Sequence, residues 1–270
     1  MDNTRHSEIV DSILASKKYR AIQVPRETIE DLIQNALTRF LKQEAAIKSV
    51  REKLHNITAP YLETVDYDAA LHQLKNIDLS LNNMILNEFC LETLSSHHST
   101  RERLPYMQEF FSFLFSRTLQ SATILDLACG LSPFALACVS TPKSVQYIAF
   151  DIHKKRVNLL NSFFDLTYIN GKAVWQDILV RPPKYQADAA FFFKEAHRME
   201  KREKGATRRI FTALNVPLIF LSLPSRSMNR QHNLRDRMNT LAEGICNGIG
   251  SITHIEEFPA EIVYEIKKYK

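Results

Sequence analysis

The chain has 270 residues, of which 45% are hydrophobic, enough for one large domain or two modest ones. Because no apolar run reaches the roughly 18 residues of a membrane span and the first residues lack a signal-peptide core, we expect a soluble cytoplasmic protein. Its four cysteines show no paired spacing, which favours reduced thiols and disfavours zinc or another bound metal.

The formal net charge of +5 is unevenly distributed along the chain. Residues 181–240 contain 13 lysines and arginines against 5 acids. Such an excess is typical of proteins that bind a polyanion, although a merely solvated basic face has the same composition. Residues 1–110 contain 13 basic and 16 acidic residues, so in that region only a local patch could bind phosphate.

The first part of the chain predicts helices. Apolar residues recur there at a helical period, and Pro25 marks a helix start. We therefore expect an all-α N-terminal domain over residues 1–110. Its clearest helical stretches are residues 9–14, 29–41, 66–76 and 80–95.

From about residue 120 short apolar strands alternate with helical stretches, a pattern that indicates an α/β fold with a mainly parallel sheet. We expect seven strands in this second domain, over residues 111–270. The predicted strands are residues 123–127, 147–151, 173–179, 187–193 and 218–223, with 252–257 and 262–266 as a last pair.

The most informative segment is Thr123–Pro133. An apolar strand ends there in a small-residue turn, and residues 134–139 predict a helix start. This unit lets the backbone approach a nucleotide-like ligand at the carboxyl edge of a sheet. Only Gly130 lies in the loop and the glycine pattern of dinucleotide-binding proteins is absent, so S-adenosylmethionine fits better than NAD.

Two further acids follow at the ends of the next strands. Asp151 suits a ribose diol, because a carboxylate can accept from both hydroxyls. Asp177 could accept from the adenine amino group while the backbone N–H of Ile178 meets a ring nitrogen. Any α/β protein has strands that end in Asp, but three acid-ended units in this order indicate a methyltransferase.

Other segments carry a more specific pattern, which extends from about residue 10 to 268. The segments are Ile13–Arg20, Lys53–His55 with Tyr61, the H-x-S-T-x-E-R match at His97–Arg103, the D-x-A-C-G-L-x-P match at Asp126–Pro133, Phe150–His153, Gln176–Leu179 with Pro182 and Pro183, and Ser222–Ser227. In these the chain resembles the 16S ribosomal RNA guanine-N7 methyltransferases that confer aminoglycoside resistance, the Arm/Rmt/Sgm group.

The resemblance implies a Rossmann-like class I methyltransferase domain that uses S-adenosylmethionine. It also implies the 30S ribosomal subunit and its 16S rRNA as partners, on which the N-terminal helical domain over residues 1–110 would dock, with guanine N7 in the decoding-site helix as the methylated atom. No general base is expected, because N7 already carries a lone pair. The implied cofactor-binding residues are Tyr61, His97, Ser99, Thr100, Arg103, Asp126, Gly130, Asp151, Ile152, Asp177, Ile178 and Phe193.

Some of these assignments have structural alternatives. Arg103 is expected to pair with the methionine carboxylate, which a planar guanidinium does well, or else with a neighbouring acid such as Glu102. Phe193 is expected to pack against the adenine face. The segment containing His97, Ser99 and Thr100 could equally cap a helix.

The RNA contacts are expected from two regions. Lys17, Lys18 and Arg20 cluster within one turn near the N-terminus and can bind phosphates. Lys194 and Arg226 follow strands four and five, and Arg230 lies just beyond. Their alternative reading is a set of solvated surface charges.

The chain also departs from the pattern of the group. Ser132 stands where the group has Asn, Phe193–Glu200 replaces an apolar F-K-L-L-P-L-L-E stretch, and Met228–Arg235 replaces a glycine-rich loop. These departures leave two alternatives open. The first is a methyltransferase that acts on another RNA position, and the second is a catalytically silent ribosome-binding homologue.

Overall fold

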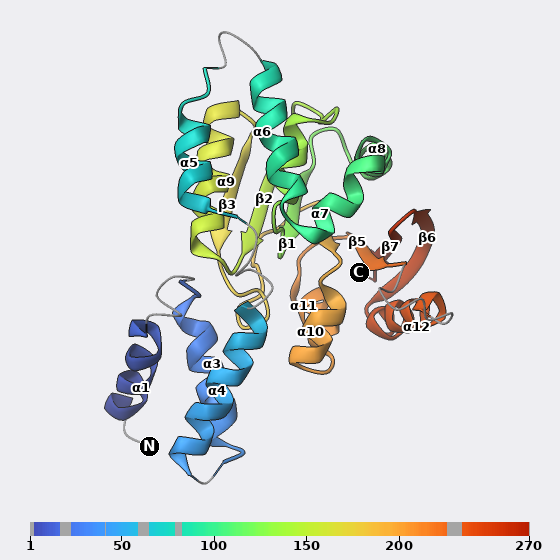
Figure 1. The fold of residues 1–270 in the computed structure, drawn as a ribbon. Helices are drawn as coiled ribbons and strands as arrows, with labels where there is room; N and C mark the ends of the chain where they lie inside the picture. The colour runs from blue at the N-terminus through green and yellow to red at the C-terminus, as the bar shows by residue number, and fades with distance from the viewer. Residues whose placement is uncertain are drawn as a thin grey trace.

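The computed structural model describes residues 3–16, 23–40, 42–58, 65–78, 83–225 and 234–269. Its described elements before the first strand are all helical, as the sequence predicts (Figure 1). They are α1 (Asn3–Ala15), α3 (Arg26–Leu37), α4 (Gln43–Thr58), α5 (Tyr67–Lys75), α6 (Asn83–Ser95), α7 (His98–Arg103), η2 (Leu104–Tyr106) and α8 (Met107–Ser116).

The rest of the chain forms a seven-stranded sheet in the order β3-β2-β1-β4-β5-β7-β6. The first five strands run parallel, whereas β7 pairs antiparallel with both β5 and β6, so the sheet is mixed. Six of the seven strands occur close to where the sequence predicts them, whereas the third, predicted over residues 173–179, covers Gly171–Trp175 and ends before Asp177. Their bounds are β1 Thr123–Leu127, β2 Gln146–Asp151, β3 Gly171–Trp175, β4 Ala189–Phe193, β5 Leu218–Pro224, β6 Gly250–Phe258 and β7 Glu261–Lys268.

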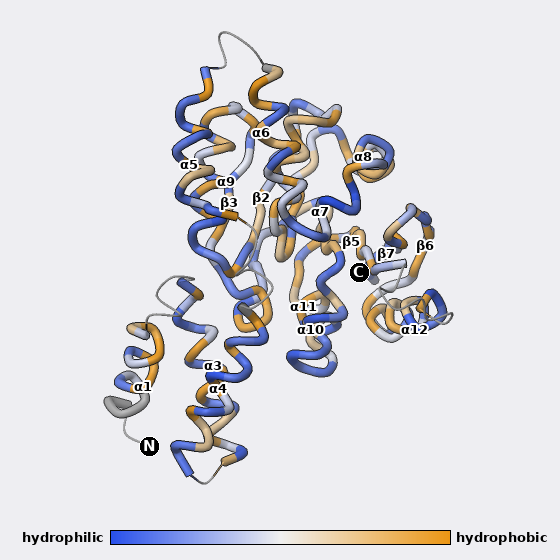
Figure 2. Tube along the Cα trace, viewed as in Figure 1, coloured by the Kyte–Doolittle hydropathy of each residue, from blue (hydrophilic) through white to orange (hydrophobic). Residues whose placement is uncertain are grey.

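Helices cover both faces of this sheet (Figure 1). Alternate strand residues point to opposite sides, so Phe191 joins one buried cluster with α5, α6, α8 and α9 (Lys154–Thr167), while Phe192 joins a second cluster. The second cluster contains α10 (Ala196–Arg202), α11 (Ala206–Ala213) and α12 (Leu234–Cys246). Both hydrophobic and hydrophilic residues occur along these helices (Figure 2), as helices with one buried face require.

The N-terminal helices divide between two cores. Residues of α1, α3 and α4 form a cluster of their own, in which Val10, Ile33 and Val50 are buried, and these helices extend away from the sheet (Figure 1). In contrast, α5, α6 and α8 share the core of the sheet. The cores therefore do not divide near residue 110, and the domain boundary expected there stays a prediction.

The segment after β1 differs from the expected helix start. It is a short 3-10 helix, η3 (Ser132–Ala137), with Pro133 in its first turn. Phe134, Ala135 and Leu136 are all buried, and η3 packs against α6. An amphipathic α-helix would expose one of three consecutive residues. The burial of all three residues therefore fits the short 3-10 helix better than the start of an amphipathic α-helix.

Within the described residues, no helix combines the length and apolar content needed to cross a membrane.

Candidate functional site

Two adjoining cavities lie at the carboxyl ends of the parallel strands. Their volumes are about 410 Å³ and 340 Å³. The larger one, called the first cavity here, lies beside β2 and the segment after β3, and the second lies beside β1 and β4. Both are lined by Ala128, Asp151, Glu195 and Arg198. This edge of an open α/β sheet is where such folds bind ligands.

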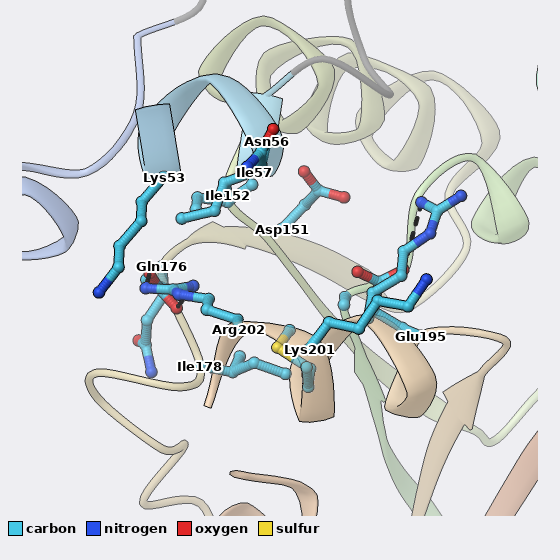
Figure 3. Close-up of a pocket in the computed structure, with 14 residues that line it drawn as sticks. Lys53, Asn56, Ile57, Asp151, Ile152, Gln176, Ile178, Glu195, Lys201 and Arg202 are labelled. Carbon is cyan, nitrogen blue, oxygen red and sulfur yellow. Dashed lines mark hydrogen bonds and ion pairs between the residues drawn. The ribbon is translucent and has the colours of Figure 1, made fainter. Parts of the chain in front are cut away.

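The first cavity lies between α4, α10 and the sheet. Ile152, Ile178 and Met199 give it apolar walls, which suit a flat aromatic ring. Figure 3 shows Asn56 and Ile57 from α4 on one side of the cavity and Arg202 from α10 on the other. Lys53 of α4 and Lys201 of α10 also line it, so that this cavity has a basic margin.

The second cavity is more polar. It is lined by His97, Ser99 and Arg103 of the segment around α7, by Gly130 after β1, and by the residues that follow β4. Ser99 Oγ lies 2.9 Å from His97 Nδ1. Burial and nearby arginines lower the pKa of His97 to about 4, so its ring is neutral at pH 7.

Asp151 lies at the junction of the two cavities. Its Oδ1 accepts from the His153 N–H at 2.8 Å, and its Oδ2 accepts from the Gly130 N–H at 3.0 Å and from Arg156 Nη1 at 2.8 Å. Asp151 and Arg156 are both buried. A carboxylate offers about four acceptor positions, so Asp151 can accept a further hydroxyl while Arg156 holds it in place.

The backbone around the cavities is strained. Ala128 and Lys194 have φ values of 51° and 54°, in the left-handed region that residues with a Cβ rarely adopt. Gly130 has a φ of 56°, and a Cβ on it would meet no atom within 4 Å, so its surface is open to a ligand. Such outliers cluster at functional sites.

The Asp177 carboxylate already accepts several hydrogen bonds within the protein, which the sequence does not indicate. Its carboxylate accepts from Thr28 Oγ1 at 2.9 Å, from the Leu179 N–H at 3.0 Å, and from Arg202 Nη1 and Nη2 at 3.1 and 2.6 Å. These four donors match the number of acceptor positions on a carboxylate. Its predicted bond to an adenine amino group therefore requires Arg202 or Thr28 to release it.

Arg103 has a different partner from the neighbouring acid considered above. Its Nε and Nη2 donate to the two carboxylate oxygens of Glu261, each at 2.8 Å, and its Nη1 donates to Ser132 Oγ at 3.2 Å. Burial disfavours the ionised form of Glu261, but Arg103 outweighs it and lowers the Glu261 pKa. The guanidinium lines the second cavity, so its predicted bond to the methionine carboxylate stays a prediction.

The residues after β4 complete the second cavity. The backbone N–H of Lys194 is held by the Oγ and the carbonyl of Ser222, at 3.1 and 2.9 Å. Glu195 and His197 then face the cavity. Burial raises the pKa of Glu195 to about 7 and lowers that of His197 to about 4.

Four predicted residues lie elsewhere than expected. Asp126 is fully buried, where it accepts from the Tyr147 hydroxyl at 2.7 Å, and it lines neither cavity. Thr100 is buried and its hydroxyl lies within hydrogen-bond distance of the carbonyl oxygens of Leu94 and His97, and His97, at the N-cap of α7, makes no side-chain cap hydrogen bond. Thr100 also lines neither cavity, so these two cofactor contacts stay predictions that the cavities do not support.

Phe193 lines the second cavity and not the first, because two strands, β2 and β1, separate β4 from β3. The apolar walls beside Asp177 are instead Ile152, Ile178 and Met199. Lys194 is 6% exposed and its Nζ pairs with Glu102 Oε2 at 2.8 Å. It is therefore a wall residue rather than a surface phosphate contact.

The remaining predictions fall into two groups. His97, Ser99, Arg103, Gly130, Asp151, Ile152, Asp177 and Ile178 all line one or both cavities. Tyr61, Lys17, Lys18, Arg20, Arg226 and Arg230 lie outside the residues that the structure describes.

Sequence reasoning missed several members of the site. Glu195, Met199 and Arg202 line the first cavity, and Arg156 and Glu261 hold Asp151 and Arg103. The departure of residues 193–200 from the expected apolar pattern was the available signal for Glu195. Nothing local in the sequence marks Glu261, since its partner lies 158 residues away.

Comparison with known proteins decides the family. The family model described as ribosomal RNA methyltransferase (FmrO) matches residues 15–250. The chain belongs to this family.

Related proteins cover nearly the whole chain. The 16S rRNA (guanine(1405)-N(7))-methyltransferase of Serratia marcescens is 28% identical over 269 residues, covering 97% of this chain and 98% of that protein. The protein of the same name from Frankia casuarinae is 28% identical over 225 residues, covering 82% and 78%.

Solved structures agree with this FmrO family assignment. The 16S rRNA methylase RmtB has a TM-score of 0.79 at 26% identity, with 98% of each chain covered. The 16S rRNA methyltransferase RmtF, in complex with S-adenosyl-L-homocysteine, has a TM-score of 0.78 at 27% identity over the full length of both chains.

Proposed function

We propose that this FmrO-family protein transfers a methyl group from S-adenosylmethionine to N7 of a guanine in 16S rRNA of the 30S subunit. The observation that carries the proposal is the pair of adjoining cavities with the Asp151 carboxylate at their junction. Relatives named 16S rRNA guanine-N7 methyltransferases support it over nearly the whole chain. The sheet order, in which β7 lies antiparallel between β5 and β6, supports the class I methyltransferase fold.

The chemistry of the cavities fits this cofactor. The first cavity, with Ile152, Ile178 and Met199, suits the adenine ring, and Asp151 can accept from the ribose hydroxyls. The second cavity offers the open surface of Gly130 and the Arg103 guanidinium for the methionine portion. The two cavities share the residues between them, so one extended ligand can occupy both.

The reaction needs alignment more than acid–base chemistry. When bound, S-adenosylmethionine supplies an electrophilic methyl group on a sulfonium. The guanine N7 lone pair forms the new N–C bond while the S–C pair returns to sulfur, so that no proton moves. The contribution of the chain is to align guanine N7 with the methyl group and the sulfur atom, and to exclude water. The backbone of Lys194 beside the second cavity, fixed by its hydrogen bonds to Ser222, is suited to that task.

The RNA side of the site is the basic margin of the first cavity, together with Arg198, which lines both cavities. Lys53, Arg198 and Lys201 line it and can contact phosphates. Guanine N7 in an A-form helix faces a deep and narrow major groove, so the base must be extruded to reach the methyl group. Lys17, Lys18, Arg20, Arg226 and Arg230 are proposed as further phosphate contacts from their place in the sequence.

The test is methyl mapping on 16S rRNA after reaction with labelled S-adenosylmethionine. We expect one 7-methylguanosine on 30S particles and little reaction with naked 16S rRNA, because recognition of folded RNA depends on its shape. If naked RNA reacts equally well, the docking role of the helical region is wrong. A methyl group on another atom or nucleotide supports the second candidate, a methyltransferase for a different RNA position, which the polar residues at 195–200 favour.

Cells that express the protein should also become resistant to aminoglycosides that bind the decoding site. A methyl group and its positive charge on N7 change the surface that such cationic drugs contact. Normal drug sensitivity in cells with fully methylated 30S particles would separate the enzymatic activity from a role in resistance.

A further inference from the structure

The polar residues that follow β4 form a subsite next to the methionine side of the cofactor cavity. Glu195 lines both cavities, and His197 lines the second. Figure 3 shows Glu195 and Asp151 on the same side of the first cavity, with Lys201 of α10 nearby. A base that approaches the methyl group from the second cavity therefore meets Glu195 and His197.

This segment is held rigidly. Lys194, with a φ of 54°, turns the chain after β4, and Ser222 of β5 fixes its backbone N–H. The backbone carbonyl of Glu195 then accepts from the N–H groups of Arg198 and Met199, at 2.9 and 3.0 Å. Such preorganisation lets a side chain act without further ordering on binding.

The two side chains have unused hydrogen-bonding capacity. Glu195 has 15% of its side-chain surface exposed, and Arg198 Nη1 is 3.5 Å from its Oε2, a distance too long for a strong hydrogen bond. Within the described part of the chain, His197 Nδ1 is buried without a hydrogen-bond partner. A buried polar atom of this kind costs free energy unless a ligand or water satisfies it.

These groups match one edge of guanine. Its Watson–Crick edge presents two donors, N1–H and the N2 amino group, beside the acceptor O6, while N7 lies on the other side of O6. A carboxylate can accept from both donors at once, and an imidazole N–H can donate to O6. Binding by this edge leaves N7 free to face the methyl group, and enzymes that flip a base commonly read it in this way.

We propose that Glu195 and His197 read the Watson–Crick edge of the extruded guanine. This inference rests on the proposed function and adds the residues that select the base. Adenine would place its N1 lone pair against the Glu195 carboxylate, so the subsite rejects it. The Glu195 carboxylate would also be hydrogen-bonded to the base, which becomes positively charged during methyl transfer. A preorganised negative group at that position stabilises the transition state.

The segment departs from the pattern of the resembling group. Glu195, Ala196 and His197 stand where the resembling group has the apolar residues of F-K-L-L-P-L-L-E. The same backbone position therefore tolerates an apolar side chain in the fold. A substitution of Glu195 is consequently expected to change recognition without preventing folding.

The experiment uses 30S particles and four variants of the full chain. Glu195→Gln keeps the size of the side chain but removes its charge and one acceptor. His197→Ala removes the ring, and His197→Asn restores an amide donor close to the position of Nδ1. Glu203→Gln is the matched control, because Glu203 is exposed on the same segment and pairs with Arg209.

We expect Glu195→Gln to lower kcat/KM for 30S methylation at least thirtyfold and His197→Ala at least tenfold. His197→Asn should recover most of that loss, and Glu203→Gln should react like the unmodified protein. The affinity for S-adenosylhomocysteine, measured by calorimetry, should stay within twofold in all four variants. We also compare 30S particles that carry adenosine in place of the target guanosine. The ratio of kcat/KM for guanosine to kcat/KM for adenosine should be at least tenfold smaller for Glu195→Gln than for the unmodified protein.

Each failure has a distinct meaning. If the unmodified protein forms no 7-methylguanosine on 30S particles, the proposed function is wrong. If it does but both Glu195→Gln and His197→Ala react at its rate, the base-reading role is wrong. If Glu195→Gln instead weakens S-adenosylhomocysteine binding tenfold or more, Glu195 contacts the cofactor and the inference is overturned.

Discussion

Thr28 and Asp177 share a buried hydrogen bond that joins helix α3 to the cofactor edge of the sheet. Thr28 Oγ1 donates to Asp177 Oδ2 at 2.9 Å, and the two residues are 149 positions apart in the sequence. Both side chains are buried. The helical region is therefore fastened directly to a predicted cofactor-binding acid, beside the cavity that α4 lines.

Thr28→Val should destabilise the protein by about 1.5–3 kcal/mol, the range for hydrogen bonds to charged groups. Valine matches threonine in shape, so the lost donor is the main change. Denaturant unfolding measures the free energy, and amide exchange in α3 should become faster. Thr38→Val is the control, since Thr38 is exposed at the end of α3 and should change stability by less than about 0.5 kcal/mol.

Glu261→Gln should lower the free energy of unfolding by about 3–5 kcal/mol, more than Thr28→Val does. Removal of the carboxylate leaves the buried charge of Arg103 uncompensated. Arg103 is 3% exposed and Glu261 is fully buried, and the guanidinium engages both carboxylate oxygens. The matched exposed pair is Arg209 with Glu203, where Glu203→Gln should cost about 1 kcal/mol or less. Similar losses for the two variants, measured by denaturant unfolding, would contradict the buried-pair argument.

The strands were predictable because their signals are local. Apolar runs such as those before Asp126 and Asp151 are closed by an acid within a few residues, and the structure confirms β1 and β2 there. The order of the acid-ended units also indicated the edge at which Gly130 and Asp151 meet.

The partners of charged residues were not predictable, because chain topology sets them. The antiparallel pairing of β5 with β7 places Glu261 two residues from Ser222 in register, within reach of a 2.6 Å hydrogen bond from Ser222 Oγ. Glu261 there also meets Arg103. The burial of Lys194 likewise depends on Glu102, which α7 supplies from 92 positions away. Composition could therefore suggest a basic surface but could not separate its exposed charges from its internal ones.

Asp151→Asn should weaken S-adenosylhomocysteine binding by about 1.5–3 kcal/mol, as expected for loss of a charge-assisted hydrogen bond. The substitution also removes the ion pair with Arg156, so unfolding must be measured beside calorimetry to separate binding from stability. Asp165→Asn on the exposed face of α9 is the control. Unchanged binding by Asp151→Asn would remove Asp151 from the cofactor site.

The pH dependence of methylation should report Glu195. Burial raises the pKa of this carboxyl to about 7, Arg198, Arg156 and Arg202 oppose that shift, and Asp151 adds to it. The protonated form cannot accept from both guanine donors, so kcat/KM for 30S particles should rise between pH 6 and 8 and then level off.

Glu195→Gln should have a lower but flat profile over the same range. His97 and His197 should not contribute there, because the pKa of each lies near 4 and both stay neutral. Measurements at constant ionic strength exclude changes in RNA binding caused by salt. A rising limb that persists in Glu195→Gln would show that another group titrates.

The basic margin of the first cavity should control RNA affinity without affecting the cofactor. Lys53 of α4 and Lys201 of α10 line that cavity, and no ion pair within the described part of the chain neutralises either of them. If each contacts one phosphate, Lys53→Ala and Lys201→Ala should each weaken 30S binding. Each should also reduce the slope of log affinity against log salt by about one unit.

Lys143→Ala is the matched control, because Lys143 is exposed in the loop before β2, at the opposite edge of the sheet. Its salt dependence and its 30S affinity should equal those of the unmodified protein, and all three variants should bind S-adenosylhomocysteine normally. Binding titrations at several salt concentrations measure the slope directly. If Lys53→Ala and Lys201→Ala keep the full slope, the RNA backbone does not pass over the first cavity, and its basic margin is only a solvated surface.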